Sequence, residues 1–349
     1  MGTPASIVRV EPVSQADADA WCEVITASMT EDLADVPPPT RAQAHPRLTG
    51  PGTGSRLLAW LAYEDDGRSR GRAVGAATLH LFDREGQDHL AEVDLHIRPD
   101  ARRRGIGTQL LSAMVAEAAS AGRRSLIAEA PACSPADLFC VRHGFRRVLT
   151  LHHLLLPLCE VHRGWLDELT TAEHPGYRSA EWHGTVPDAL ADAFAAAKTA
   201  MNGMNDMPTG DLDHGSVAWD AERVRAMAAV VTGRGDTLLT VAAVHGAENA
   251  EVAGFTEVVI PGGTAARARQ YDTTVVPAHR GHGLGVWLTA HMLRRLHDEY
   301  PQVTEVETSN AADDIHMLAV NEQLGFRRLR TTYEYQLALT ERTEREEPA

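Results

Sequence analysis

Two short basic segments with the same glycine spacing lie far apart in the chain, and each precedes an apolar pattern typical of a helix. The first is RRRGIG at Arg102–Gly107, and the second is RGHGLG at Arg280–Gly285. They begin 178 residues apart, and Asp94 and Asp272 keep the same spacing ahead of them. The segments that flank the two turns therefore decide whether the chain is a repeat or the match is a coincidence.

The flanking segments also match, in the same order. Upstream, Leu57–Glu64 aligns with Leu238–His245, and downstream Arg142–Val148 aligns with Gln323–Leu329, both at an offset of 181 residues. Matches that occur in one order, at an offset that changes by only a few residues along the chain, indicate two copies of one domain. A period near 180 residues is far too long for a solenoid repeat.

Each copy shows the same order of expected elements. A strand, a helix and a loop rich in Pro, Gly and Asp (residues 32–52 and 202–215) are followed by three strands, the glycine turn with its helix, a fifth strand, a short helix and closing strands. The expected elements with clear bounds are the opening strands Ile7–Val13 and Tyr177–Trp182, the first helices Ala16–Met29 and Pro187–Met201, and the fifth strands Ser125–Glu129 and Glu305–Ser309.

This order predicts an α/β (α+β) protein with two tandem domains, each a mixed, mostly antiparallel sheet flanked by helices. We expect the first domain to span residues 1–158 and the second to span residues 177–340. The polar segment 159–176 is expected to be a linker with a helical middle. The charged tail 341–349 is expected to be disordered.

Composition and charge limit the function. The formal net charge of −15 argues against nucleic acid as the main partner. No apolar run approaches the roughly 20 residues of a membrane span, and the first residues show no signal-peptide pattern. We therefore expect a cytoplasmic protein, a monomer or a homodimer, with no membrane partner.

Cysteines and histidines give no sign of a metal site. The four cysteines form no CxxC pair, which is consistent with reduced thiols in the cytoplasm. The 17 histidines are scattered, and we expect them to be surface or packing residues. The expectation from the sequence is therefore that no metal is bound.

A glycine turn between a strand and a helix is suited to binding phosphate. The helix N-terminus presents unpaired N–H groups, and glycine lets the backbone approach an anion closely. The spacing fits neither GxxxxGK[ST] nor GxGxxG with a following acidic residue. An ordinary strand-to-helix turn is the alternative for either copy taken alone.

The pattern Arg-x-x-Gly-x-Gly after a strand ending apolar-x-Pro resembles motif A of the GCN5-related N-acetyltransferases (GNAT). Both glycine turns fit this motif, and the later Gly-Phe pairs at Gly144–Phe145 and Gly325–Phe326 fit the short helix that follows in the family. The resemblance covers nearly the whole chain twice. It is similar in plan to the tandem mycothiol synthases, and it implies acetyl-CoA as co-substrate.

The resemblance also implies which residues hold the CoA pyrophosphate and pantetheine arm. In the first copy these are Ile97, Arg103, Arg104, Gly105, Ile106, Gly107 and Thr108. In the second copy they are Val275, Arg280, Gly281, His282, Gly283, Leu284, Gly285 and Val286, together with Asn310. The backbone amide near Val275 is expected to stabilise the oxyanion.

The general acid of the family is often a Tyr four residues before the Gly of Gly-Phe, and both copies lack it. Cys140 and Asn321 occupy these positions, so a water molecule is expected to protonate the leaving thiolate. The candidate bases in the second copy are Asp272 and Glu257, and either could instead be a solvent-facing carboxylate. Tyr271 is an alternative residue facing the cleft.

Amides mark the second copy as the better-equipped one. Asn321 and Asn310 are expected to contact the pantetheine arm, although Asn310 could simply be a helix cap. Asn202, Asn205 and Asp206 follow the first helix, where the resemblance places the acceptor loop. A flexible loop is the alternative for these three, because Asn and Asp are common in turns.

These observations predict an N-acetyltransferase that moves acetyl from acetyl-CoA to the primary amine of a small molecule, by direct attack in a ternary complex. The second domain is expected to carry the chemistry, and the first is expected to be degenerate. The acceptor could be an amino sugar or antibiotic, a pseudo-disaccharide cysteine amide or a peptide N-terminus. The alternative is a non-catalytic acyl-CoA-binding or scaffold protein with decayed sites.

Overall fold

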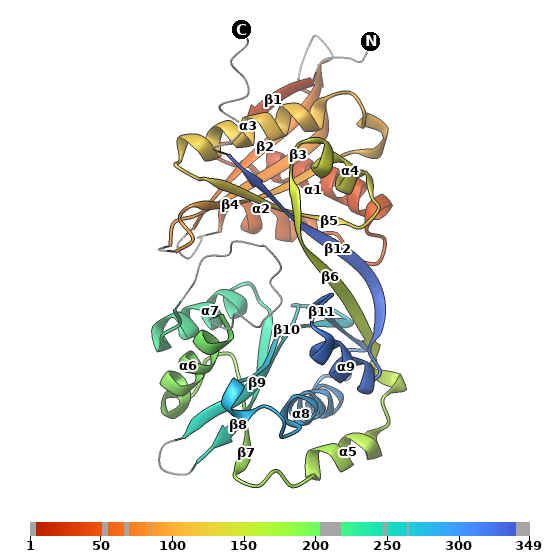
Figure 1. Ribbon diagram of the computed structural model, residues 1–349. Helices are drawn as coiled ribbons and strands as arrows, with labels where there is room; N and C mark the ends of the chain where they lie inside the picture. Colours follow the sequence, from red (N-terminus) through yellow and green to blue (C-terminus); the bar gives the residue numbers. More distant parts are fainter. Residues whose placement is uncertain are drawn as a thin grey trace. The chain divides into compact units, whose positions relative to one another are not determined.

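The computed structural model describes residues 5–50, 55–65, 70–84, 86–202, 218–246, 250–263 and 265–339 (Figure 1). Within this part of the chain, two compact units are formed. The first contains residues 5–148 and 333–339, and the second contains residues 149–332. The acceptor residues Asn205 and Asp206, the side chain of Asn202 and the tail 341–349 lie outside the described residues.

The first unit contains a mixed sheet in the order β1-β2-β3-β4-β5-β12. Neighbouring strands from β1 to β4 are antiparallel, and β4 and β5 are parallel. The last part of β12 joins β5 through the bond from Gln336 Nε2 to Ser125 Oγ (2.7 Å). The strands are β1 (Ala5–Arg9), β2 (Ser55–Asp65), β3 (Arg70–Phe82), β4 (Leu90–Ile97), β5 (Ser125–Pro131) and β12 (Arg327–Ala338).

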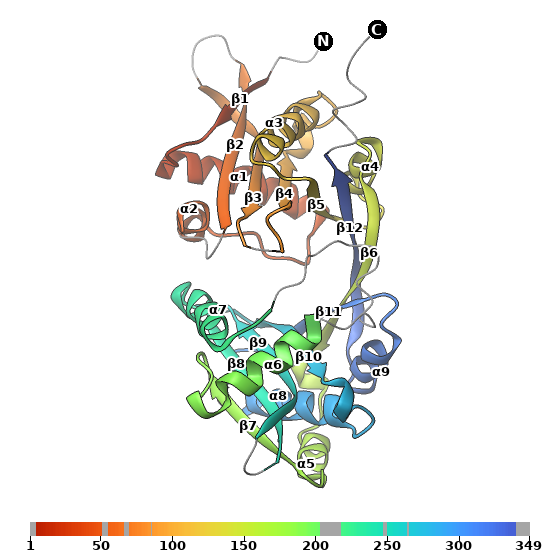
Figure 2. The same ribbon diagram turned by 60° about the vertical axis from the view of Figure 1, so that its left-hand side comes forward.

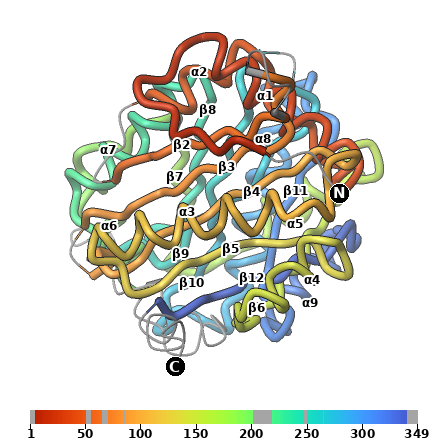
Figure 3. Tube along the Cα trace, turned by 90° about the horizontal axis from the view of Figure 1, so that it is seen from above, coloured from red at the N-terminus to blue at the C-terminus, as the bar shows by residue number. Residues whose placement is uncertain are grey.

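Helices cover both faces of this sheet, because its strands alternate apolar side chains between two cores. In β2, Leu61 packs with helices α1 (Gln15–Asp32) and α2 (Arg41–Thr49), whereas Trp60 packs with α3 (Ile106–Ser120). Figure 3 shows α3 lying along the strands, where it contacts β3 and β4. The short helix α4 (Pro135–Arg142) borders the same core as α3.

The second unit repeats this arrangement with strand order β12-β6-β11-β10-β9-β8-β7. The pairs from β7 to β10 are antiparallel, β10 and β11 are parallel, and β11 and β6 are antiparallel. The strands are β6 (Arg146–Pro157), β7 (Tyr177–His183), β8 (Thr237–His245), β9 (Glu251–Ile260), β10 (Arg267–Val275) and β11 (Glu305–Ala311).

The helices of the second unit also cover two faces. Figure 2 shows α6 (Ala191–Asn202) and α7 (Ala221–Gly233) beside β8 and β9, where Phe194 and Phe255 form one core. On the other face α8 (Leu284–Glu299) packs against α5 (Arg163–Thr171). The short helix α9 (Ile315–Gln323) follows β11, as the repeat predicts.

The last strand of each repeat packs into the core of the other repeat. Tyr335 and Leu337, from the end of β12, belong to the core of the first unit. Leu154 and Leu156, from β6, belong to the core of the second unit. The expected domain limits at residues 158 and 340 therefore differ from the observed units, because a repeat fixes the order of strands but not the sheet that each strand joins.

Three helices depart from the sequence expectations. Helix α2 lies inside residues 32–52, which were expected to form a loop, and it contains Pro46. Helix α7 was not expected; Asp220 caps it by accepting a bond from the N–H of Arg223 (2.7 Å). Helix α5 is more than a linker, since Leu166 is buried in the core beside α8.

Among the described residues, no helix is both long and apolar enough to cross a membrane. All four cysteines have free thiols.

Candidate functional site

Each unit has a wedge where its two parallel strands diverge. In the second unit β10 and β11 pair only from Arg267–Arg269 to Glu305–Glu307, after which β11 continues along β6. In the first unit β4 and β5 pair only from Leu90–Glu92 to Ser125–Ile127. An extended molecule can add to such a divergent edge as a further strand would.

The backbone groups at the end of each wedge point into it. In the second unit the N–H of Val276 donates to the carbonyl of Ala253 (2.9 Å) on β9. Because successive residues of a strand direct their N–H groups to opposite edges, the N–H of Val275 is directed to the wedge. The bond from the N–H of Arg98 to the carbonyl of Val74 (2.9 Å) directs Ile97 in the same way in the first unit.

The glycine turns deliver helix N-termini to the same ends of the wedges. Gly283 is the N-cap of α8 with φ of 72°, and Gly105 is the N-cap of α3 with φ of 81°, both left-handed conformations. Neither N-cap supplies a side-chain hydrogen bond to the first turn. A Cβ added at Gly281 or Gly105 would meet nothing within 4 Å. Both turns therefore offer the open amide cluster that binds an anionic group.

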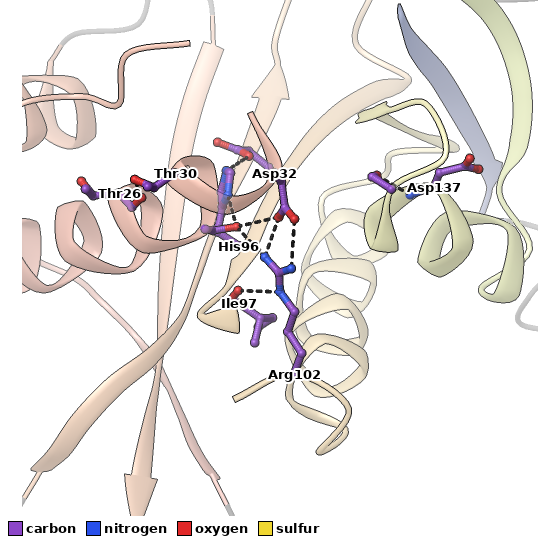
Figure 4. A network of polar contacts seen from close by, with 10 residues as sticks. Thr26, Thr30, Asp32, His96, Ile97, Arg102 and Asp137 are labelled. Carbon is purple, nitrogen blue, oxygen red and sulfur yellow. Dashed lines mark hydrogen bonds and ion pairs between the residues drawn. The ribbon is translucent and has the colours of Figure 1, made fainter. Parts of the chain in front are cut away.

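The arginines of the first turn are partly used within the protein (Figure 4). Arg102 holds Asp32 through two bonds (2.5 and 3.0 Å), and its Nε donates to the carbonyl of Ile97 (3.1 Å). Arg104 pairs with Glu64 at 3.0 Å. Arg103 is exposed, with φ of 64°, and no partner is recorded for it within the described residues. Only Arg103 of the three is therefore available to an anion without breaking a pair.

A half-buried polar network surrounds Arg102 in the first unit, and no motif in the sequence predicts it. His96 Nδ1 lies 3.2 Å from Ser28 Oγ, and His96 Nε2 lies 2.8 Å from Asp94 Oδ1. Burial lowers the pKa of His96, but Asp94 and Asp32 together raise it, so the pKa lies above its usual value. The network binds α1 to β4 and fills the space beside Ile97.

The second unit has a lysine where its two candidate bases meet. Lys198 is the only lysine of the 349 residues. Its Nζ lies 2.5 Å from Glu257 Oε2 and 2.9 Å from Asp272 Oδ2, and the residue is only 3% exposed. The structure therefore brings Asp272 and Glu257 together, and it places both in ion pairs with Lys198.

Aromatic rings enclose the lysine. Its Nζ lies 4.9 Å from the ring centre of Trp219, 5.0 Å from Phe255 and 5.5 Å from Phe194. Ring faces attract a cation at these distances. Together with the two carboxylates, the rings hold the ammonium group at one place beneath β9 and β10.

A bulge in β10 brings Asp272 to this cluster. Gln270 pairs with Val258 and Thr273 pairs with Thr256, so the register shifts between them. The equivalent strand of the first unit, β4, pairs with β3 from Ala91 to Ile97 without a break. A bulge redirects side chains locally, and here it affects Asp272 and the exposed Tyr271.

The charges of the cluster perturb each other. Burial raises the pKa of Glu257; Lys198 opposes this rise and Asp272 adds to it, and the pKa remains raised. Burial lowers the pKa of Lys198, but Asp272 and Glu257 raise it above its usual value. One ammonium shared by two carboxylates leaves one net negative charge when all three groups are ionised.

The two predicted asparagines also meet. Asn321 Nδ2 on α9 donates to Asn310 Oδ1 on β11 (2.7 Å). Asn321 is 1% exposed and its Oδ1 has no hydrogen-bond partner, whereas Asn310 is half-buried. Asn321 therefore orients Asn310 at the edge of the wedge, and its own amide is out of reach of a large substrate.

The residues at the missing tyrosine positions cannot act as acids near neutral pH. Burial raises the pKa of Cys140 to about 12, and Asp137 adds to the rise. Asn321 carries no acidic proton. Protonation of the leaving thiolate by water therefore stays a prediction.

Known proteins match parts of the sequence and the fold of this chain. Residues 22–145 match the acetyltransferase (GNAT) family model. No curated protein matches the chain in sequence.

Several solved structures match nearly the whole chain. A tandem GNAT protein from the clavulanic acid biosynthesis pathway is 26% identical with a TM-score of 0.76, over 96% of this chain and 99% of that one. A GCN5-related N-acetyltransferase from Sphaerobacter thermophilus is 17% identical with a TM-score of 0.67, over 95% of this chain and 96% of that one. Their shared architecture contains two copies of one fold.

Proposed function

Since the chain is a tandem GNAT-type protein, we propose that it transfers acetyl from acetyl-CoA to the primary amine of a small molecule. We place the chemistry in the second domain and in the cytoplasm, where free cysteines remain reduced. One observation carries the proposal: the bulge in β10 sets Asp272 beside Lys198 and Glu257, three residues before the amide of Val275 that faces the wedge.

The donor is held mainly by backbone groups. The pyrophosphate binds the amides that begin α8, from Gly283 to Val286, beside Gly281, where an added Cβ would meet nothing within 4 Å. The pantetheine arm pairs with β10 along the wedge and meets Asn310 on the facing strand. The thioester carbonyl then accepts a bond from the N–H of Val275.

The acceptor is a cation before it reacts, and the site is suited to a cation. The cluster of Lys198, Glu257 and Asp272 has one negative charge in excess when ionised. The side chain of Asp272 is 32% exposed, whereas that of Glu257 is only 10% exposed. Asp272 is thus the group that an incoming ammonium can reach, and an opposite charge stabilises the ammonium in a partly buried site.

The reaction then proceeds in a ternary complex. Asp272 accepts a proton from the ammonium, and the free amine attacks the thioester carbonyl carbon. The tetrahedral oxyanion is stabilised by the N–H of Val275. The C–S bond breaks, the CoA thiolate leaves, and the second amine proton passes through water to the thiolate, which gives an amide and CoA.

The first domain is proposed to be the degenerate copy. Arg102 already bonds the Ile97 carbonyl, so a pantetheine arm would have to displace it. The regular pairing of β4 gives no bulge at Asp94, which pairs with His96 instead. These contacts stabilise the fold of the first unit and leave less room for a ligand in its wedge.

The glycine turns provide a matched test of which domain works. Gly283→Glu and Gly105→Glu each place a carboxylate at a left-handed N-cap. A like charge beside the pyrophosphate costs several kcal/mol, so Gly283→Glu should lower the rate of CoA release at least about 100-fold. Gly105→Glu should retain it. The opposite pattern would move the chemistry to the first domain.

The aspartates provide a second matched pair. Loss of a general base lowers turnover by about 100- to 10,000-fold, so Asp272→Asn should do so in an assay of CoA release with a panel of amines. Asp94→Asn should leave turnover near the wild-type value. Acetyl-CoA binding without turnover on any amine would support the alternative, a non-catalytic acyl-CoA-binding protein.

A further inference from the structure

A row of three side chains crosses the sheet of the second unit beside its glycine turn. Tyr177 on β7 pairs with His245 on β8, and His245 pairs with Glu251 on β9. Residues that are direct neighbours across strands place their side chains on the same face. His279, from the turn Pro277–His279 before the glycines, packs against the Tyr177 and His245 rings, with centroids 5.6 and 5.1 Å away.

His279 carries a buried nitrogen that has no hydrogen-bond partner among the described residues. The residue is 7% exposed, and its Nδ1 lies 3.0 Å from the Tyr177 hydroxyl. Its Nε2 is buried without a hydrogen-bond partner. Glu251 Oε1 lies 3.2 Å from this nitrogen, but in a direction that does not make a hydrogen bond. When the proton of His279 is on Nδ1, its Nε2 and Glu251 Oε1 both present a lone pair, and the two atoms face each other without a proton between them.

We propose that His245, Glu251 and His279 bind a divalent transition-metal ion of the zinc class. Their ligand atoms all lie within 4.8 Å of one another. Two imidazoles and one carboxylate are a ligand set that Zn²⁺ accepts, with a fourth position for water. A cation between His279 Nε2 and Glu251 Oε1 satisfies both atoms at once.

The present spacing is close to what the ion requires. Zinc bonds of about 2.0–2.1 Å at tetrahedral angles hold ligand atoms about 3.3 Å apart. His279 Nε2 and Glu251 Oε1 are already 3.2 Å apart. His245 is half-buried at a strand end and Glu251 is exposed, so rotation of the His245 side chain can complete the set.

Tyr177 supplies the support that metal-bound histidines usually have. A ligand histidine commonly uses its second nitrogen in a hydrogen bond that fixes its tautomer and orientation. The Tyr177 hydroxyl takes this role for His279. The cluster therefore has one buried ligand, His279, which Tyr177 orients. Its other two ligands, His245 and Glu251, are more accessible.

The site belongs to the second copy alone. In the repeat alignment, Glu64 stands opposite His245 at the offset of 181, and Ala101 stands opposite His279 at the offset of 178. Glu64 pairs with Arg104 in the first unit. Metal binding would tie the β8–β9 hairpin to the turn that leads into the second glycine loop, and it does not depend on the proposed acyl transfer.

Calorimetric titration of Zn²⁺ into the metal-free full chain tests the proposal, with Co²⁺ absorption as a second readout of ligand geometry. We expect one tight equivalent per chain and a tetrahedral Co²⁺ spectrum. Glu251→Gln and His245→Gln should each remove the tight equivalent, and both are accessible enough to leave the fold intact. Tyr177→Phe should weaken binding by about 10- to 100-fold.

The control is a second histidine–carboxylate pair in the same unit. His183 Nε2 lies 3.3 Å from Glu299 Oε2, outside the cluster. His183→Gln should leave the tight equivalent unchanged. The proposal is overturned if the wild type binds no ion tightly, or if binding survives both Glu251→Gln and His245→Gln.

Discussion

Replacing the only lysine tests how the cluster at the second wedge is held together. Lys198→Met removes the ammonium and leaves Glu257 and Asp272 facing each other without a cation. At contact distances of 2.5 and 2.9 Å, each ion pair contributes about 6 kcal/mol of attraction at an effective dielectric constant of about 20. Desolvation of the three charges offsets most of this. The variant should lose about 3–5 kcal/mol of unfolding free energy.

The loss should depend on pH and on Glu257. Without Lys198 the buried carboxylate ionises less readily, so its folded-state pKa lies further above the unfolded value. The penalty is then full above that raised pKa and disappears as pH falls toward the unfolded value near 4.3. Adding Glu257→Gln to the variant should recover part of the stability, because the remaining Asp272 is partly exposed.

Urea unfolding followed by tryptophan fluorescence measures both effects, since Trp219 lies beside Lys198. In the wild type, ¹⁵N-lysine NMR should give a single side-chain ammonium signal that persists above pH 10.5, the usual lysine pKa, because the pKa of Lys198 is raised. A loss below about 1 kcal/mol, unchanged by Glu257→Gln, would refute the reasoning.

Two further predictions concern the first unit and the thiols. Burial, together with Glu129 and Glu92, raises the pKa of Glu334 to about 7; its ionisation therefore destabilises the fold increasingly from pH 4.5 to 7, by up to about 3 kcal/mol. Glu334→Gln should raise the melting temperature at pH 8 and leave it unchanged at pH 4, and an equal shift at both values would contradict this. Iodoacetamide should modify two thiols of the native protein quickly and two slowly, as mass spectrometry of the intact chain will show. The fast pair is Cys133 and Cys159, and the slow pair is Cys22 and Cys140.

The repeat made it possible to predict the fold from the sequence. Two copies of the same strand–turn–helix pattern predicted the central elements of both units, including the helices that begin at Gly105 and Gly283. Helix α2 was expected to be part of a loop, because its proline and few apolar residues are typical of a loop. Only the tertiary contacts of Ala44 and Leu48 with α1 and β2 explain it.

The elements that carry the candidate site residues could be predicted from the sequence, but the contacts of these residues could not. By their positions in the repeat, Asp272 and Glu257 could be assigned to strands, Asn310 to the end of the fifth strand and Asn321 to the short helix, where the structure also has them. Their partners could not be placed, because the bulge that turns Asp272 toward Lys198 leaves no mark in the residue pattern. The lysine itself carried a usable signal, since it is the single lysine among 33 basic residues.

The histidine cluster illustrates a different limit. His245 and Glu251 lie six residues apart at the two ends of a hairpin, so their meeting follows from strand register, which one residue of slippage would abolish. His279 enters from a turn much later in the chain. Spacing in the sequence alone gave no reason to select His245 and His279 from 17 histidines, or to group them with Glu251.

The exchange of closing strands has a consequence for how the protein is made. The first unit is missing a core strand until Tyr335 and Leu337 have left the ribosome, about 185 residues after Val148. At about 5–20 residues per second, that delay is about 10–40 seconds. During this interval β5 has an unpaired edge in the nascent chain, a form open to chaperones and to wrong pairing. The two repeats thus mature together at the end of synthesis, although the first was translated long before.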